Sequence, residues 1–353
     1  SIVLGGTVTD TFVQSNAGND SLDLVALTRS TVKGGAGIDW ITQAGAVLST
    51  TIEGNKGADS IYIGGGTSAT NNLQKSSVQG GTGADSIDIQ ARMLTSTVRS
   101  GAGADSLSLT LATSAGVNAK AKVFGDAGAD SILINAGYGG VTIYGDNENG
   151  ASGNDTLNIG GDIINQEIRA NKGDDWITGS GAITSTTLNS GAGNDSISLG
   201  TGAISGTSFI ETSAGENEVA IGGLVTSLTF IGGAGNDTVT FALAVTSASI
   251  VGGAGNDVFT FTTGGTGLTT GNNTYFFGSS GGADSITFQG GQTGTVIAVS
   301  ADFGGTGSYT GGLITLGNEN TVQLIAEATT GFGTLTTGIS VVTVSQATID
   351  ALG

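Results

Sequence analysis

The chain has 353 residues, of which 65 are glycine, 29 are acidic and 10 are basic, and it contains no proline, cysteine or histidine. Without histidine or cysteine, the sequence excludes Ser-His-Asp and Cys-His nucleophiles, HExxH metalloproteases, and zinc, copper or haem sites built on imidazole or thiolate. A net charge of −19 disfavours nucleic acid as a partner, and the absence of any run of 18 apolar residues predicts no membrane insertion.

A six-residue segment that ends on an acidic residue or its amide recurs thirteen times along the chain. Clear copies read SGAGND at Ser190–Asp195 and GGAGND at Gly232–Asp237 and Gly252–Asp257. Most copies lie 19 to 27 residues apart, commonly 20, and we number the positions of each segment one to six. The sixth position is Asn217 in one copy and aspartate in the others, namely Asp20, Asp39, Asp59, Asp85, Asp105, Asp130, Asp155, Asp175, Asp195, Asp237, Asp257 and Asp284. This period predicts a solenoid with one coil per repeat.

Apolar residues alternate with polar ones on both sides of each segment, which predicts strand, loop, strand in every coil. The residues two places after the sixth position are Leu22, Ile41, Ile61, Ile87, Leu107, Ile132, Leu157, Ile177, Ile197, Val219, Val239, Phe259 and Ile286. Those two places before most loops are Val32, Ile52, Val78, Val98, Val123, Leu188, Ile210, Phe230 and Ile250. One coil has too few apolar side chains for a core, so we expect parallel stacking with strands about 4.8 Å apart.

The fourth loop position is glycine in all thirteen copies, for example Gly18, Gly37 and Gly83. Because glycine readily adopts positive φ, this predicts a tight turn of fixed geometry. The absence of proline agrees with stacking, since every interior strand needs its backbone N–H groups.

Two regions depart from the period. Before Asp155 we place an insertion at Gly145–Asn149, on the loop side of the coil. After about residue 290 the loops stop, and we expect strands at Thr293–Val299, Gly312–Leu316, Thr321–Ile325 and Ile339–Val344, with a short helix at Gln346–Leu352. The predicted organisation is therefore a solenoid of about thirteen coils at 1–290 and a small β-rich C-terminal cap at 291–353.

Stacking places the twelve loop aspartates in one line, about 5 Å apart. Neighbouring carboxylates at that distance repel by about 1 kcal/mol in water and about 3 kcal/mol at an effective dielectric of 20. Ten such contacts along the line outweigh the stability of an ordinary domain, so the line requires cations. Oxygen ligands in a flexible geometry favour Ca²⁺ over Mg²⁺, because Mg²⁺ demands a tighter octahedron and keeps its waters. A single aspartate would be read as a turn former, but twelve at one register favour metal.

Each loop with its following strand resembles GGxGxDxUx, the calcium-binding nonapeptide of the RTX (repeats-in-toxin) family. Gly252–Thr260 matches every fixed position, and the resemblance covers about residues 13–290. It implies an all-β, right-handed parallel β-solenoid, although the sequence itself does not fix the hand. It also implies carbonyl ligands at loop positions one to four, which include Gly232, Ala234, Gly252 and Ala254.

The family places a loop on both sides of each coil, whereas this chain has one loop per about 20 residues. We therefore expect roughly ten or more Ca²⁺ ions in a single row, bound by the twelve aspartates and these carbonyls. Asn217 marks a weak or empty site, and the insertion puts the Asp155 loop in question. The family position of 291–353 implies a type I secretion or assembly region.

The glycine-, serine- and threonine-rich composition resembles bacterial S-layer proteins. We expect a secreted, non-catalytic structural protein of the bacterial cell surface, an S-layer or extracellular fibre subunit. The alternative is the calcium-rigidified stalk of an adhesin whose binding head lies outside this chain. The acidic pairs Asp174/Asp175 and Glu216/Glu218 are poor candidates for a glycosidase couple, because they lie in or beside the metal loops.

Self-association, head to tail into a fibre or lattice, is the partner that we expect first. A cell-surface polysaccharide is a second candidate, with Trp40 and Trp176 as contact aromatics. Ice binding would favour a repeated threonine row on the loops, but the third loop position is mostly alanine and is threonine only at Thr82.

Overall fold

The structure, a computed structural model, divides into two compact units, Ser1–Thr178 (unit 1) and Gly179–Gly353 (unit 2). It describes residues 1–64, 72–110, 120–135, 140–147, 152–262, 269–270, 273–277, 282–289, 292–293, 295–300, 308–310, 313–315, 321–326 and 339–344. Within these ranges all regular secondary structure is β, which confirms the predicted all-β class. The described residues include no helix with the length and hydrophobicity to cross a membrane.

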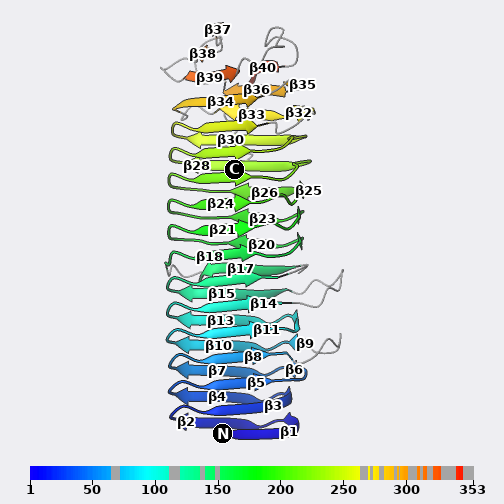
Figure 1. Ribbon diagram of the computed structural model, residues 1–353, viewed down its shortest axis with the longest axis vertical. Helices are drawn as coiled ribbons and strands as arrows, with labels where there is room; N and C mark the ends of the chain where they lie inside the picture. The colour runs from blue at the N-terminus through cyan, green and yellow to red at the C-terminus, as the bar shows by residue number, and fades with distance from the viewer. Residues whose placement is uncertain are drawn as a thin grey trace. The chain divides into compact units, whose positions relative to one another are not determined.

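In unit 1 each coil gives one strand to each of two parallel sheets, and the loops join the sheets along one edge (Figure 1). The pre-loop sheet contains the strands before the loops: β2 (Phe12–Ala17), β4 (Thr31–Ala36), β7 (Thr51–Lys56), β10 (Ser77–Thr82), β13 (Thr97–Ala102), β15 (Ala121–Ala127), β17 (Val141–Asp146) and β20 (Glu167–Arg169). The post-loop sheet contains β1 (Ile2–Thr9), β3 (Ser21–Thr28), β5 (Trp40–Gln43), β8 (Ser60–Ile63), β11 (Ser86–Ile89), β14 (Ser106–Leu109), β16 (Ser131–Ile134), β18 (Thr156–Ile159) and β21 (Trp176–Gly179). Short strands lie at the turns opposite the loops: β6 (Val47–Leu48), β9 (Asn72–Gln74), β12 (Arg92–Leu94) and β19 (Ile163–Ile164).

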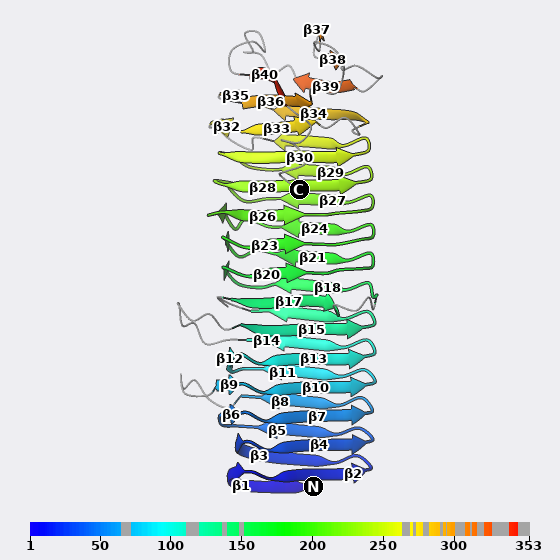
Figure 2. The ribbon, with the colours of Figure 1, turned by 180° about the vertical axis from the view of Figure 1, so that it is seen from behind.

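Neighbouring coils pair without a register shift through most of unit 1. In the pre-loop sheet Val32 lies opposite Ile52, and Ile52 lies opposite Val78. Every apolar residue predicted two places after or before a loop is buried, with an exposed fraction of 0 to 1%. Equivalent loop positions are therefore stacked directly on one another, and Figure 2 shows the same stack of unit 1 from behind.

Unit 2 is built in the same way. Its pre-loop strands are β23 (Thr187–Asn189), β26 (Ser208–Glu211), β28 (Leu228–Ala234), β30 (Ala248–Ala254), β33 (Thr274–Phe277), β36 (Thr295–Ser300) and β40 (Ile339–Val344). Its post-loop strands are β24 (Ser196–Leu199), β27 (Glu218–Ile221), β29 (Thr238–Phe241), β31 (Val258–Thr262), β34 (Ala283–Gln289) and β39 (Thr321–Ala326). The shorter strands are β22 (Ile183–Thr184), β25 (Ile204–Ser205), β32 (Thr269–Thr270), β35 (Gln292–Thr293), β37 (Ser308–Thr310) and β38 (Leu313–Thr315).

The four strands predicted after residue 290 are present as β36, β38, β39 and β40. β39 pairs in parallel with β34, and β40 with β36, so these strands continue the two sheets of unit 2. The antiparallel pairs β37–β38 and β38–β39 are the part that differs from a coil. The helix predicted at 346–352 lies outside the described residues, and the division at residue 290 stays a prediction.

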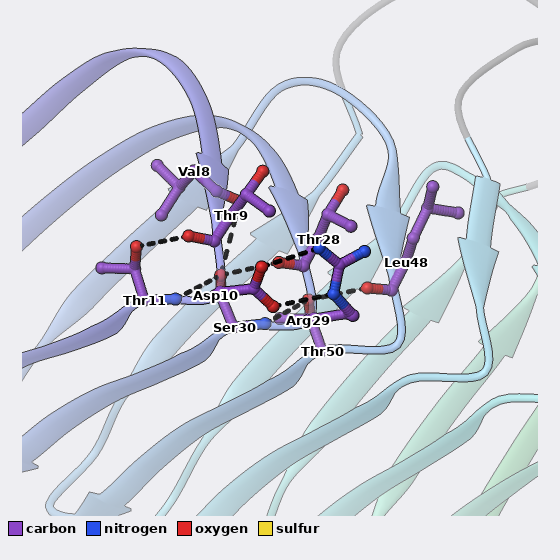
Figure 3. Close-up of polar contacts among 9 residues, drawn as sticks. All are labelled: Val8, Thr9, Asp10, Thr11, Thr28, Arg29, Ser30, Leu48 and Thr50. Atoms are coloured by element: carbon purple, nitrogen blue, oxygen red, sulfur yellow. Dashed lines mark hydrogen bonds and ion pairs between the residues drawn. The ribbon is translucent and has the colours of Figure 1, made fainter.

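A column of buried hydroxyl groups holds the turns opposite the loops, and the sequence analysis does not predict it. The N–H of Thr11 donates to Ser30 Oγ, and the N–H of Ser30 donates to Thr50 Oγ1, at 3.2 and 3.3 Å (Figure 3). Ser76 and Ser96 extend the column in the following coils. Each hydroxyl lies four residues before the first loop position, and this spacing is a signal that the sequence does contain.

Candidate metal centre

The loop aspartates of unit 1 form one column of hydrogen bonds through the stacked coils. The backbone N–H of each aspartate donates to Oδ1 of the aspartate one coil further along. The N···Oδ1 distances are 2.7 to 2.9 Å for Asp20–Asp39, Asp39–Asp59, Asp59–Asp85, Asp85–Asp105, Asp105–Asp130, Asp130–Asp155 and Asp155–Asp175. Except for Asp20, all of these aspartates are buried. The predicted alignment of carboxylates therefore exists, but on the inside of the loop edge.

Unit 2 contains the same column with one amide in it. The N–H of Asp195 donates to Asn217 Oδ1 at 2.9 Å, and the N–H groups of Asp237 and Asp257 donate to the next aspartate in turn. Asn217 differs because its Nδ2 also donates to Asp237 Oδ1 at 2.9 Å. An amide at this position thus supplies a proton donor where the other coils present a second carboxylate oxygen.

That second oxygen, Oδ2, is buried and accepts no hydrogen bond in a set of loop aspartates from both units. These residues are Asp39, Asp59, Asp85, Asp130, Asp155, Asp237 and Asp257. A buried carboxylate oxygen without a donor is strongly unfavourable when the group is ionised. Each of these sites therefore requires either a proton on the carboxyl group or a cation beside it.

A second acceptor lies close to Oδ2 in the same place. A β-carbon added to Gly34, at the first loop position, would lie 2.5 Å from Asp39 Oδ2 and 2.9 Å from the carbonyl oxygen of Gly54. The same two kinds of oxygen converge beside Gly232, from Asp237 and from the carbonyl of Gly252. An Oδ2 atom that lacks a donor and a carbonyl oxygen thus approach one point, which makes it an electron-rich site between successive coils.

Burial raises the pKa of six carboxyl groups of this set, and neighbouring carboxylates add to the effect: Asp59, Asp85, Asp130, Asp155, Asp237 and Asp257. The pKa is raised to about 7 for Asp130, Asp155 and Asp257, chiefly by burial, while the N–H bond from the preceding aspartate partly opposes the shift. Burial likewise raises the pKa of Asp85 and Asp284 to about 6. Without a cation, the folded state therefore favours protonated carboxyl groups near neutral pH.

The loop backbone explains the glycine at position four and a second restricted position. Gly83 at position four has φ +130°, as predicted, but Gly81 at position two also has φ +125°. Asn55 adopts φ +81° at position two of its loop. The sequence shows this requirement, since the residues with positive φ at position two are all glycine, asparagine, aspartate or serine: Asn16, Gly35, Asn55, Gly81, Gly101, Asp126, Asn171, Gly191, Ser213, Gly233 and Gly253.

The carbonyl groups named as ligands have different surroundings. The Ala234 and Ala254 carbonyls accept the N–H groups of Gly215 and Gly235, at 2.8 and 2.7 Å, so both belong to the backbone ladder. The Gly232 carbonyl accepts the Thr212 hydroxyl at 2.7 Å, and the Gly252 carbonyl faces Asp237 Oδ2 beside Gly232. As metal ligands, these four carbonyls and the twelve aspartates stay a prediction.

The structure corrects the position of the insertion near Asp155. Because β17 pairs with β15, Asp146 lies opposite Asp126, and Gly145 and Asp146 take loop positions one and two. The extra residues of the sequence therefore come after Asp146, as part of the loop, and not before the loop begins. This pairing places two buried acidic groups, Asp126 and Asp146, side by side. Their surroundings differ. Arg99 Nη1 lies 2.5 Å from Asp126 Oδ1, whereas Asp146 Oδ1 accepts no hydrogen bond.

The residues of the column fit Ca²⁺ by their chemistry. Buried carboxylate oxygens that lack a donor lie beside backbone carbonyl oxygens, and a hard cation with six to eight oxygen ligands prefers such donors. Among the described residues no three carboxylates gather at one point. Each ion would therefore take one or two carboxylates, with carbonyl groups or water as its remaining ligands.

Replacing Asp130 with asparagine is expected to change stability in opposite directions with and without calcium. At neutral pH and without calcium, the amide removes a buried ionisable group, so the free energy of unfolding should rise by about 1–3 kcal/mol. With saturating calcium it should fall by a similar amount, because a carboxylate ligand is lost. Thermal unfolding in both conditions measures this. The exposed Asp23→Asn is the control, with changes within about 0.5 kcal/mol. The same sign in both conditions would contradict the assignment.

No protein-family model matches this chain, and no curated protein matches it. Among solved structures, it is similar to a hyperactive, Ca²⁺-dependent, β-helical antifreeze protein from an Antarctic bacterium. The two structures have a TM-score of 0.51 and 23% sequence identity, over 80% of this chain and 77% of that chain. This likeness supports the fold, a β-solenoid built from coils of about 20 residues.

Proposed function

We propose that this protein is a non-catalytic β-solenoid whose coils are held together by Ca²⁺, and that it serves as a secreted structural component of the bacterial cell surface. The observation that carries the proposal is a set of buried loop aspartates whose Oδ2 atoms lack a donor and lie beside a carbonyl oxygen of the next coil, namely Asp39, Asp59, Asp85, Asp130, Asp155 and Asp237. A divalent cation shared between coils supplies the missing positive charge and ties successive coils together.

Calcium dependence in the β-helical neighbour supports the choice of metal, because that protein is described as Ca²⁺-dependent and has the same fold. Extracellular calcium sites bind at about 10⁻⁴–10⁻³ M, so a protein that needs this metal to fold is suited to the outside of the cell. Type I export through residues 291–353 remains part of this proposal.

A structural role, and not catalysis, agrees with the placement of the acidic residues. Asp175 is buried in the aspartate column, whereas its neighbour Asp174 is exposed, so the two carboxylates do not face one substrate. Glu216 and Glu218 are exposed on either side of the buried Asn217. The burial of Asp175 thus argues against a glycosidase couple at the first pair.

Assembly of the purified protein distinguishes the two structural roles. For an S-layer or fibre subunit, we expect filaments or sheets in negative-stain images at millimolar calcium, with their loss after chelation. A monomer in sedimentation at the same calcium concentration would instead support the stalk of an adhesin. A control at high ionic strength separates calcium-specific assembly from simple charge screening, since screening acts with any salt.

The antifreeze activity named for the neighbour is not part of this proposal. On the outer side of the unit 1 loops, position three carries the exposed Ala36, Lys56 and Thr82 in successive coils, and position five carries Ile38. A row with such mixed charge and size does not present the repeated hydroxyl pattern that we expect of an ice-binding face.

A further inference from the structure

The chain has two tryptophans, and both lie exposed at the same register position of unit 1. Trp40 opens β5 with 58% of its surface exposed, and Trp176 opens β21 with 54% exposed. Each directly follows a loop aspartate, and the next residue, Ile41 or Ile177, is fully buried. Because side chains alternate along a strand, both indole rings lie on the outer face of the post-loop sheet.

One column of small hydroxyl side chains connects the two tryptophans. Trp40 lies opposite Ser60, and the column continues through Ser86, Ser106, Ser131 and Thr156. The N–H of Trp176 then donates to the Asp155 carbonyl at 2.8 Å, which places it one coil further. Six strand spacings of about 4.8 Å separate the rings by about 29 Å. Figure 1 shows β5, β8, β11 and β14 in this order within unit 1.

A second outer column, two residues along each strand, carries hydrogen-bonding groups that are already ordered. Thr42 Oγ1 donates to Asp23 Oδ1 at 3.0 Å, and Gln90 Nε2 donates to Asp88 Oδ2 at 2.9 Å. The Tyr62 hydroxyl lies 3.0 Å from Gln90 Oε1. We call the two columns together the tryptophan face. Their fixed acceptors and donors have little conformational entropy to lose when a ligand binds.

The charge of the tryptophan face restricts what binds there. All ten basic residues of the chain lie elsewhere, on the pre-loop sheet, in the loops, or at the opposite turns and β12: Lys33, Arg99, Lys122, Arg169, Lys56, Lys172, Arg29, Lys75, Lys120 and Arg92. Asp23 and Asp88 make the face acidic. An anionic polymer would be repelled, whereas a neutral ligand rich in hydroxyl groups meets hydrogen-bonding and aromatic groups, with the partly exposed Leu133 as the aliphatic side chain of the second column.

We propose that the tryptophan face binds a neutral, extended polysaccharide that runs along the stack of coils. The rings of a β-1,4-linked hexose chain recur at an interval close to the strand spacing of about 4.8 Å. Their apolar faces pack on indole rings, and their hydroxyl groups bond to Ser, Thr, Asp and Asn side chains. A chain of about six sugars reaches from Trp40 to Trp176. This inference needs unit 1 to be folded, but it does not depend on self-association.

Because the chain has no other tryptophan, the tryptophan emission, excited selectively so that the five tyrosines do not contribute, reports on this face alone. With the calcium-loaded protein, cellohexaose or chitohexaose is expected to shift the emission to shorter wavelength and to protect it from acrylamide. Cellobiose is expected to bind at least about tenfold more weakly, because it contacts one ring only. Circular dichroism before each titration shows that the protein is folded, so a failure of folding is not mistaken for a failure of binding.

Calorimetry with Trp40→Ala and Trp176→Ala is expected to show about tenfold weaker binding of the hexasaccharide for each variant, and none for the double variant. Phe12→Ala is the matched control, because Phe12 is an aromatic residue with 61% exposure on the pre-loop sheet. Unchanged fluorescence with both hexasaccharides would overturn the proposal. Wild-type affinity in the double variant, or tighter binding of the anionic hexagalacturonate, would overturn it too.

Discussion

Chelation of calcium at about pH 8 is expected to unfold the protein, whereas chelation at about pH 4 is expected to leave its β structure intact. Asp130, Asp155 and Asp257 have a folded-state pKa near 7, raised by burial, against about 3.9 in an unfolded chain. A raised carboxyl pKa stabilises the folded state fully below the unfolded value. This stabilisation is lost as the pH rises toward the folded value.

Calcium reverses this dependence on pH. The metal binds the ionised carboxylates, so its stabilisation is present at about pH 8 and disappears toward about pH 4. Thermal unfolding followed by far-UV circular dichroism, with chelator and with millimolar calcium, gives the two curves. We expect them to differ most at high pH and to meet near pH 4. A melting temperature without calcium that does not vary over this range would show that the buried carboxyl groups do not control stability.

Alanine in place of Gly57 is expected to destabilise the protein by about 3 kcal/mol or more. Gly57 has φ +129°, and an added β-carbon would overlap the carbonyl oxygen of Gly37 in the preceding coil. Backbone atoms of two stacked coils cannot separate without breaking the hydrogen bond from the Gly37 N–H to the Lys56 carbonyl, which is 2.8 Å long. Chemical denaturation of the calcium-loaded protein measures the loss.

Gly18→Ala is the matched control for this prediction. Gly18 occupies the same loop position with φ +112°, but an added β-carbon there meets nothing within 4 Å. Its replacement should cost only the strain of a left-handed alanine, about 1 kcal/mol. Equal losses for the two variants would mean that conformational strain, and not contact between coils, makes glycine necessary at position four.

Much of the fold could be predicted because each coil repeats the same few physical requirements. Leu22, Ile41 and Ile61 recur at one register because each must fill the same layer of the core, and all three are buried as expected. The line of aspartates was predictable for the same reason. One copy of the loop would have supported neither conclusion, since a single Asp-Gly turn has many explanations.

The features that could not be predicted from the sequence are those whose residues vary chemically while their backbone role stays fixed. At loop position two, Asn55 and Gly81 have different side chains, but both adopt a backbone conformation with positive φ. At the opposite turn, Ser30 and Thr50 are common polar residues, and only the stacking shows that each hydroxyl accepts an N–H of the preceding coil. The insertion near Asp155 was misplaced because Gly150 completes a segment like the others, whereas strand pairing assigns Gly145 to position one.

The side of the loops on which the carboxylates lie also required the structure. The spacing alone predicts a row of carboxylates at the loop edge. It does not show whether these side chains point outward into water or inward into the solenoid. Because Asp59 and Asp85 point inward, each is both a hydrogen-bond acceptor for the coil before it and a buried acid. In the proposed calcium site, a proton and the metal ion would therefore compete for the same carboxylate group.

In unit 1 the aspartate column also has a direction, since the N–H of each loop aspartate from Asp20 to Asp155 donates to the carboxylate of the coil that follows. A coil therefore recognises its successor through the same two atoms at every step, whatever the rest of its sequence contains. Duplication or deletion of one whole coil leaves donor and acceptor matched across the new junction. The fold consequently sets no fixed number of coils, and the length of such a protein is free to evolve in steps of about 20 residues.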